Sequence, residues 1–144
     1  MPEVHLVVGV TLIVFNLAAF AVGGIAWLRS QPSVSFWYLL RAAQVAVFVQ
    51  ALLGGLLVFT GHEASDDLHY LYGIAPLVVS FIAEGARAGA AERELGDVDF
   101  EALPAAEQES LAMAIVRREM GIMAVSCGVI LFLALRAAGT SAAF

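Results

Sequence analysis

Two of the three histidines in this chain begin the same short pattern, in which a glycine follows four residues later. His5 begins HLVVG and His69 begins HYLYG, and each pattern stands where a long apolar stretch starts. Imidazole binds haem iron, zinc and copper, so two histidines held face to face are a candidate axial ligand pair for one haem. On a helix, Gly9 and Gly73 fall on the same faces as their histidines, one turn further along. Glycines there would let a flat ligand approach the backbone.

The composition indicates that membrane-spanning helices hold these histidines. The chain has 144 residues, of which 61% are hydrophobic and 14% are charged, and its mean hydropathy is +0.88. A soluble domain of this size needs more polar surface. The net charge of −6 and the lack of a basic stripe argue against nucleic-acid binding. The single cysteine, Cys127, excludes an internal disulfide.

Four apolar stretches are long enough to cross a bilayer, which takes about 20 helical residues. We expect spans at about residues 4–28, 36–60, 67–90 and 110–136. Because an unpaired backbone polar group is costly in lipid, these spans must be helical. The sequence therefore predicts one domain, 1–144, with an all-α fold: an integral membrane four-helix bundle.

The arginines predict how this bundle is oriented in its membrane. Six of the seven basic residues flank the first and third connections, and only Arg136 falls at the opposite end. The six are Arg29, Arg41, Arg87, Arg93, Arg117 and Arg118. Because basic residues favour the cytoplasmic side, both termini and all three histidines are expected to be extracytoplasmic, in what we expect to be a bacterial cytoplasmic membrane. The third and fourth helices are expected to extend on the cytoplasmic side.

Several other residues are expected near the level of the two histidines. The first and third helices run in the same direction and are diagonal neighbours in a bundle, so their histidines should lie at similar depth. Gly54 and Gly55 of the second span reach that depth as well. His62, in the loop 61–67, is either solvated, bonded to a haem propionate or part of a metal site. Arg136 either pairs with a propionate or anchors its helix at the interface.

The segment VQALLGGLLVFTGHEASDDLHYLYG, residues 49–73, resembles part of the haem A synthase family. In that family, a helix with a Gln-x-x-x-Gly pattern leads through a short outer loop to a helix that opens with a haem-ligating histidine. The resemblance implies that Gln50 and Gly54 match the first of these helices and that His69 matches the second histidine of a pair. His5 matches the first histidine by position. The chain corresponds to one four-helix half of such a synthase, and it lacks the Glu and His-Arg context around the first histidine.

Among the charged residues inside the predicted spans, two fall at similar depth near the expected cytoplasmic side. They are Arg41 on the second helix and Glu84 on the third, with Glu119 and Arg117 or Arg118 expected nearby. Charged side chains within a membrane usually face the bundle and pair with one another. We therefore predict a structural Arg41–Glu84 ion pair. A proton-linked site or a quinone head-group site at this position is the alternative.

The function that these patterns favour is that of a small membrane b-type cytochrome, with one haem b between His5 and His69. No nucleotide loop or hydrolase motif is present, so an electron carrier or subunit fits better than a stand-alone enzyme. One alternative is an accessory subunit of a larger, respiratory-type membrane complex, packed through small residues such as Gly85 and Gly89. Another is a zinc or copper site that also uses His62. Expected partners are the lipid bilayer, other membrane subunits or a second copy of the chain, and a quinone.

Overall fold

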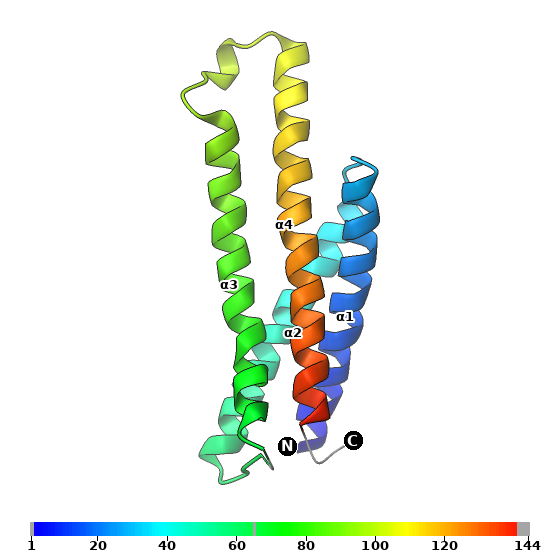
Figure 1. The fold of residues 1–144 in the computed structure, drawn as a ribbon, viewed down its shortest axis with the longest axis vertical. Coiled ribbons are helices and arrows are strands. Elements are labelled where there is room, and N and C mark those ends of the chain that lie inside the picture. The colour runs from blue at the N-terminus through cyan, green and yellow to red at the C-terminus, as the bar shows by residue number, and fades with distance from the viewer. Residues whose placement is uncertain (1, 65, 141–144) are drawn as a thin grey trace.

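The computed structural model describes residues 2–64 and 66–140 of the chain. These residues form four long α-helices, α1 (Pro2–Leu28), α2 (Val34–Phe59), α3 (Leu68–Leu95) and α4 (Ala105–Gly139), with a short 3-10 helix η1 (Phe100–Ala102) before the last. The helices form an up-and-down bundle (Figure 1), which confirms the predicted all-α four-helix fold. Each of the four is long and apolar enough to cross a membrane, as expected of an integral membrane protein.

The order of the helices around the bundle decides which residues can face each other. Helix α1 packs against α2 and α4, and α3 packs mainly against α4, while α2 and α3 touch less extensively. Helices α1 and α3 are therefore the diagonal pair, and both start at the same end of the bundle (Figure 1). At the other end, α3 and α4 continue beyond α1 and α2 as a projecting hairpin closed by η1.

The turn between α1 and α2 is held by backbone and side-chain hydrogen bonds. Ser30 has a positive φ of 53°, and the next N–H, that of Gln31, donates to the Ala26 carbonyl at 3.0 Å. This arrangement ends α1 in a Schellman-type turn. Helix α2 then starts at once, because the Ser33 hydroxyl accepts a hydrogen bond from the Phe36 amide at 3.2 Å. The first two helices therefore form a tight hairpin.

Aromatic rings packed against glycines bring the helices of the core close together. A Cβ added to Gly23 of α1 would lie 2.4 Å from the Phe36 ring, and one added to Gly121 of α4 would lie 2.7 Å from the Trp27 indole. Small residues allow such close approach between helices in a membrane, where packing replaces the hydrophobic drive. The buried cluster around these contacts includes Ala19, Phe36, Leu40, Met120, Met123 and Cys127.

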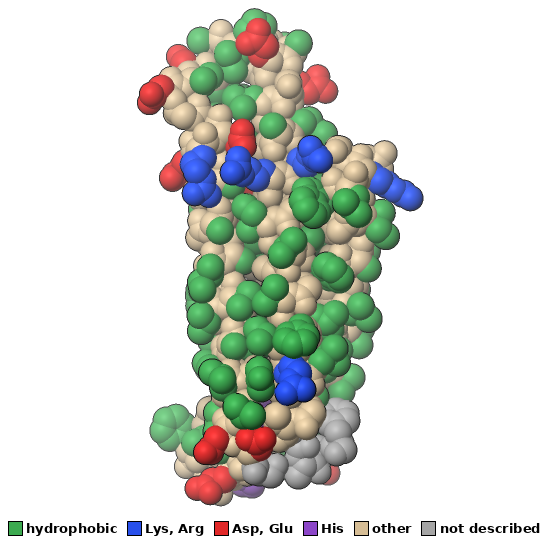
Figure 2. Space-filling view, viewed as in Figure 1, with side chains coloured by type: hydrophobic (Ala, Val, Ile, Leu, Met, Phe, Trp, Pro, Cys, Tyr) green, Lys and Arg blue, Asp and Glu red, His purple; other side chains and the backbone are tan. Residues whose placement is uncertain are grey.

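Charged side chains divide the surface of the bundle into distinct levels. Figure 2 shows a band of basic side chains at the level where α1 ends and α2 begins, acidic side chains on the projecting hairpin, and a largely apolar surface on the other side of the band. We call the end with this band, which carries the six arginines of the first and third connections, the arginine end. The opposite end, where α1 and α3 begin, is the histidine end.

Candidate functional site

The first turns of α1 and α3 bring His5 and His69 together at the histidine end. Their ring centres lie 6.2 Å apart and the ring planes are inclined by 59°. Both side chains are half-buried. Two imidazoles that bind one metal from opposite sides, with metal–nitrogen bonds of about 2 Å, place their ring centres roughly 6 Å apart. The spacing of this pair therefore suits a shared metal between the rings.

The His69 ring is fixed by the last turns of α4. Its Nδ1 lies 2.9 Å from the carbonyl oxygen of Ala137, and since a carbonyl only accepts, this nitrogen carries the proton and donates. The neutral ring then has a bare lone pair on Nε2, which makes no hydrogen bond with the residues that the structure describes. A histidine whose one nitrogen donates to a carbonyl while the other is free has the usual arrangement of a metal ligand.

The His5 ring is held by Gln50 of α2 in a comparable way. The Nε2 of His5 lies 3.2 Å from the side-chain amide of Gln50. Its Nδ1 is buried and has no partner, and neither has the Oε1 of Gln50. If the amide turns over about its terminal bond, Oε1 accepts the Nε2–H of His5, which satisfies the glutamine oxygen and leaves Nδ1 with a bare lone pair. The ring then presents one nitrogen to a ligand.

Unpartnered polar atoms are concentrated at this pair. Among the described residues, four buried side-chain atoms lack a hydrogen-bond partner, and two of them are the His5 Nδ1 and the Gln50 Oε1. The others, Asn16 Oδ1 and Ser80 Oγ, lie deeper in α1 and α3. A buried polar atom left unpaired costs about 1–3 kcal/mol, so such atoms are rare unless a ligand, ion or water completes them.

Glycines clear the space around the two rings. A Cβ on Gly54 would lie 3.4 Å from the Cε1 of His5, and one on Gly9 would lie 3.0 Å from the Gln50 amide nitrogen. A Cβ added to Gly55 or to Gly73 would have no heavy atom of a neighbouring group within 4 Å. Two of the four predicted glycines therefore sit against the histidine–glutamine contact, and two face open space. Together with the free nitrogens, this arrangement fits a flat ligand coordinated from both sides.

The remaining predicted site residues lie at the rim. His62 is exposed and its Nδ1 lies 3.2 Å from the Thr60 hydroxyl. Within residues 2–64 and 66–140, no group of three or more His, Cys, Asp or Glu residues is placed to hold a metal ion, so the zinc or copper arrangement with His62 is not formed. The guanidinium of Arg136 lies 5.6 Å from the centre of the Tyr72 ring. Arg136 directly precedes Ala137, whose carbonyl accepts the hydrogen bond from His69.

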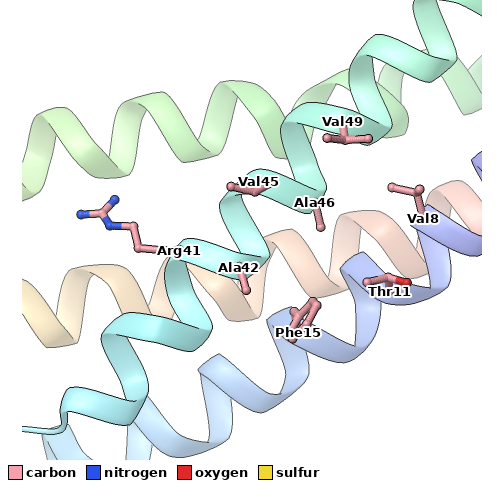
Figure 3. Close-up of a pocket in the computed structure, with 8 residues that line it drawn as sticks. All are labelled: Val8, Thr11, Phe15, Arg41, Ala42, Val45, Ala46 and Val49. Atoms are coloured by element: carbon pink, nitrogen blue, oxygen red, sulfur yellow. The ribbon is translucent and has the colours of Figure 1, made fainter.

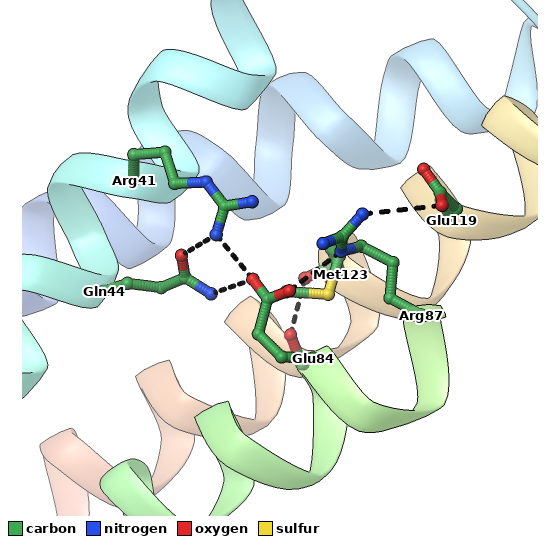
Figure 4. A network of polar contacts seen from close by, with 7 residues as sticks. Arg41, Gln44, Glu84, Arg87, Glu119 and Met123 are labelled. Carbon is green, nitrogen blue, oxygen red and sulfur yellow. Dashed lines mark hydrogen bonds and ion pairs between the residues drawn. The ribbon is translucent and has the colours of Figure 1, made fainter. Parts of the chain in front are cut away.

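The predicted charged pair lies at the arginine end. Arg41 and Glu84 approach to 2.6 Å, and the Gln44 amide donates to the same carboxylate oxygen at 2.7 Å. The second carboxylate oxygen accepts from Arg87 at 2.8 Å, and Arg87 also reaches Glu119 of α4 at 3.4 Å. Figure 4 shows these side chains from α2, α3 and α4 converging on Glu84. The cluster balances two positive charges against two negative ones.

A shallow apolar groove connects the surface near the middle of the bundle with this cluster. It has a volume of about 460 Å³ and runs between α1 and α2 from Val8 to Arg41. Figure 3 shows its valines, alanines and Phe15 facing one another, while the Arg41 guanidinium points away from α1. The only hydroxyl in the groove, that of Thr11, donates to the Val7 carbonyl of its own helix. The groove therefore has an apolar lining, apart from Thr11 and the Arg41 guanidinium at one end.

One contact of these clusters had no signal in the sequence, and another had only a partial one. The carbonyl of Ala137 is a backbone group, and any residue type could supply it. Arg87 completes the link from Glu84 to Glu119, and only its spacing of three residues from Glu84 indicates the first of these contacts. Comparison of the chain with protein-family models, with curated proteins and with solved structures finds no match.

Proposed function

We propose that this protein is a small membrane b-type cytochrome in which His5 and His69 hold one haem b between them at the histidine end. One observation carries the proposal. The two rings are 6.2 Å apart, and each has one nitrogen engaged by the protein and a second nitrogen without a protein partner. The resemblance of residues 49–73 to a segment of the haem A synthase family supports the same ligand pair.

Each neighbouring group has a definite task in this proposal. The Ala137 carbonyl fixes the tautomer of His69, and Gln50 fixes the orientation of His5. Gly55 and Gly73 leave room for the macrocycle, and the cation of Arg136 is available to a propionate. The haem would supply a reversible one-electron change of its iron. Because two histidines fill both axial positions, the residues favour electron transfer over binding of oxygen.

The arginines support a position of this site at the extracytoplasmic face. Six of the seven basic residues lie at the opposite end of the bundle, which is the cytoplasmic end by the positive-inside rule. The described part of the arginine end has no second histidine pair, so the chain alone offers no haem-to-haem path across the membrane. Electrons would pass between the haem and an outer donor, a quinol or a partner subunit in a bacterial cytoplasmic membrane.

A second candidate function is that of an accessory subunit. Gly85 and Gly89 lie one turn apart on α3, and a Cβ on Gly85 would meet no heavy atom within 4 Å. A Cβ on Gly89 would meet only the Arg93 side chain of the same helix. Among the described residues no other helix covers these two glycines, so this surface could pack against another membrane helix. The accessory function predicts co-purifying membrane subunits and no bound pigment.

A haem titration distinguishes the candidate functions. We expect the purified protein to bind haem in a one-to-one ratio with saturation, and the double variant His5→Ala/His69→Ala to bind none. Elemental analysis of the same preparation should find no stoichiometric zinc or copper. Unsaturable binding of haem, or equal binding by the double variant, would contradict the proposal and favour the accessory function.

A further inference from the structure

The turn between α1 and α2 forms a recess that no part of the proposed haem function uses. It has a volume of about 320 Å³. Its inner wall on α1 is apolar and includes Val22 and Ile25, and its outer wall is polar and includes Arg29, Gln31 and Ser33. The recess therefore has an apolar part beside the membrane-crossing segment and a polar part at the helix end.

The cation in this recess has no counter-charge in the protein. The Arg29 side chain is exposed and makes no hydrogen bond or ion pair with any residue that the structure describes. Four other arginines at the same end are engaged: Arg41 and Arg87 pair with Glu84, Arg118 pairs with Glu94, and Arg93 donates to the Ala86 carbonyl. Arg117 of α4 is exposed and, like Arg29, makes no such contact with a described residue. Arg29 differs from Arg117 because it lines a recess with an apolar wall.

The charge of the surrounding turn has one sign only. No Asp or Glu occurs between Val4 and His62. The one acidic residue of the two helices, Glu3, stands in the first turn of α1 at the opposite end, so the α1–α2 turn carries positive charge and no negative charge. The acidic side chains of the arginine end belong to α3, α4 and their connection. Trp27 stands two residues before Arg29 and packs on Gly121 of α4, in the manner of the interfacial tryptophans that mark head-group level.

We propose that this recess binds an anionic phospholipid, with the phosphate on Arg29 and an acyl chain along Val22 and Ile25. A guanidinium binds phosphate oxygens through two parallel hydrogen bonds, and the Gln31 amide can donate a further one. Ile25 is 53% exposed and belongs to a candidate membrane-spanning helix, so an acyl chain could lie against this apolar wall. The Schellman-type turn fixes the backbone of the recess, which reduces the ordering that binding requires.

Native mass spectrometry of the full chain in a mild detergent tests this site. We expect phosphatidylglycerol to remain bound to the wild-type protein at concentrations at which phosphatidylcholine does not. Arg29→Gln should weaken the binding of phosphatidylglycerol about fivefold, while Arg29→Lys should weaken it less. The matched control is Arg118→Gln, which removes one positive charge from the same end but from a residue paired with Glu94, and it should leave lipid binding near the wild-type level.

Three results would overturn the proposal. One is equal retention of phosphatidylglycerol by the wild-type protein and Arg29→Gln, and another is an equal loss in Arg29→Gln and Arg118→Gln, which would indicate unspecific attraction to net charge. The third is displacement of the lipid by millimolar inorganic phosphate, which would assign the recess to a free anion. A circular dichroism spectrum and a melting curve for each variant verify that it remains folded.

Discussion

The two polar clusters of this bundle differ in how far the protein satisfies its own groups. At the arginine end, the Glu84 carboxylate receives hydrogen bonds from Arg41, Gln44 and Arg87. At the histidine end, the His5 Nδ1 is buried without a partner, although it lies in a helix more apolar than the one that carries Glu84. A polar network in which every group is paired and the charges balance stabilises a fold. A network that leaves buried nitrogens without a partner is the arrangement expected of a binding site for a ligand.

The histidine pair and the Arg41–Glu84 cluster are the two candidate locations for a redox ligand, and they differ in how their polar groups are paired. The sequence alone left open whether Arg41 and Glu84 form a structural pair or a quinone head-group site. Their donors and acceptors are directed at one another (Figure 4), and the adjoining groove is apolar apart from Thr11 and Arg41 itself. We therefore propose a structural role for this cluster and a ligand-binding role for the histidine pair.

Removal of a proposed ligand should have the largest effect. We expect His69→Ala to abolish haem absorbance completely, because the ring held by the Ala137 carbonyl is one of the two proposed haem ligands. A visible spectrum of the purified variant measures this directly. Unchanged absorbance in His69→Ala would show that the ligand assignment is wrong.

Filling the open space below the histidines should have the next largest effect. Gly73→Leu places a side chain where no heavy atom now lies within 4 Å, so the free protein has room for it but a bound macrocycle does not. We expect at least a tenfold lower haem affinity, roughly 1.4 kcal/mol or more. The matched control is Gly85→Leu, at an equally open glycine of the same helix. If both variants bind haem as well as the wild type, the macrocycle does not occupy this space.

A substitution in the cluster at the arginine end should lower the stability of the fold and leave haem binding unchanged. Glu84→Gln leaves Arg41 and Arg87 without their shared carboxylate, and we expect it to lower the free energy of unfolding by about 1–3 kcal/mol. Thermal denaturation followed by circular dichroism measures the loss. The haem spectrum should stay as in the wild type. The control Glu94→Gln, which breaks one ion pair with Arg118 where Glu84→Gln breaks two, should cost about 0–1 kcal/mol. A lost spectrum in Glu84→Gln would link the two clusters and break the distinction between them.

The smallest expected effect concerns the group that orients His5. Gln50→Leu removes the amide beside the His5 Nε2 and keeps the size of the side chain. A hydrogen bond from Nε2–H raises the electron density of the ring and stabilises the oxidised iron, so its loss should raise the midpoint potential. One hydrogen bond of about 1 kcal/mol corresponds to about 40 mV for one electron. A redox titration followed by absorbance measures the shift, and a lower potential would contradict the assigned role of Gln50.

Much of the fold could be predicted from the sequence, because length and apolar character dictate spanning helices directly. The positions of His5 and His69 followed as well, since two helices that run in the same direction bring residues from their first turns to one level. The Ala137 carbonyl could not be found in this way, because a backbone group has no residue type. The contact of Gln50 with His5 depends on how α2 is inclined against α1, and that inclination results from packing such as that of Phe36 on Gly23.

The pairing of the arginines could not be predicted from the sequence either. Their uneven distribution is visible in the sequence and predicts an orientation, but which of them is paired depends on the register of three helices. Arg41, inside a predicted span, was expected to need a partner and meets Glu84 at 2.6 Å. Arg29, in a turn, has no described partner, and nothing in the sequence distinguishes its neighbourhood from that of Arg93, which donates to the Ala86 carbonyl.

The central claim is that the free nitrogens of the histidine pair bind haem iron from both sides. The most direct measurement is the visible spectrum of the protein purified from haem-replete cells, first oxidised and then reduced with dithionite. We predict a Soret band that sharpens and shifts to the red on reduction, together with a narrow α-band, in a preparation that contains about one haem per chain. A colourless protein from the same cells that also takes up no added haem would contradict the account.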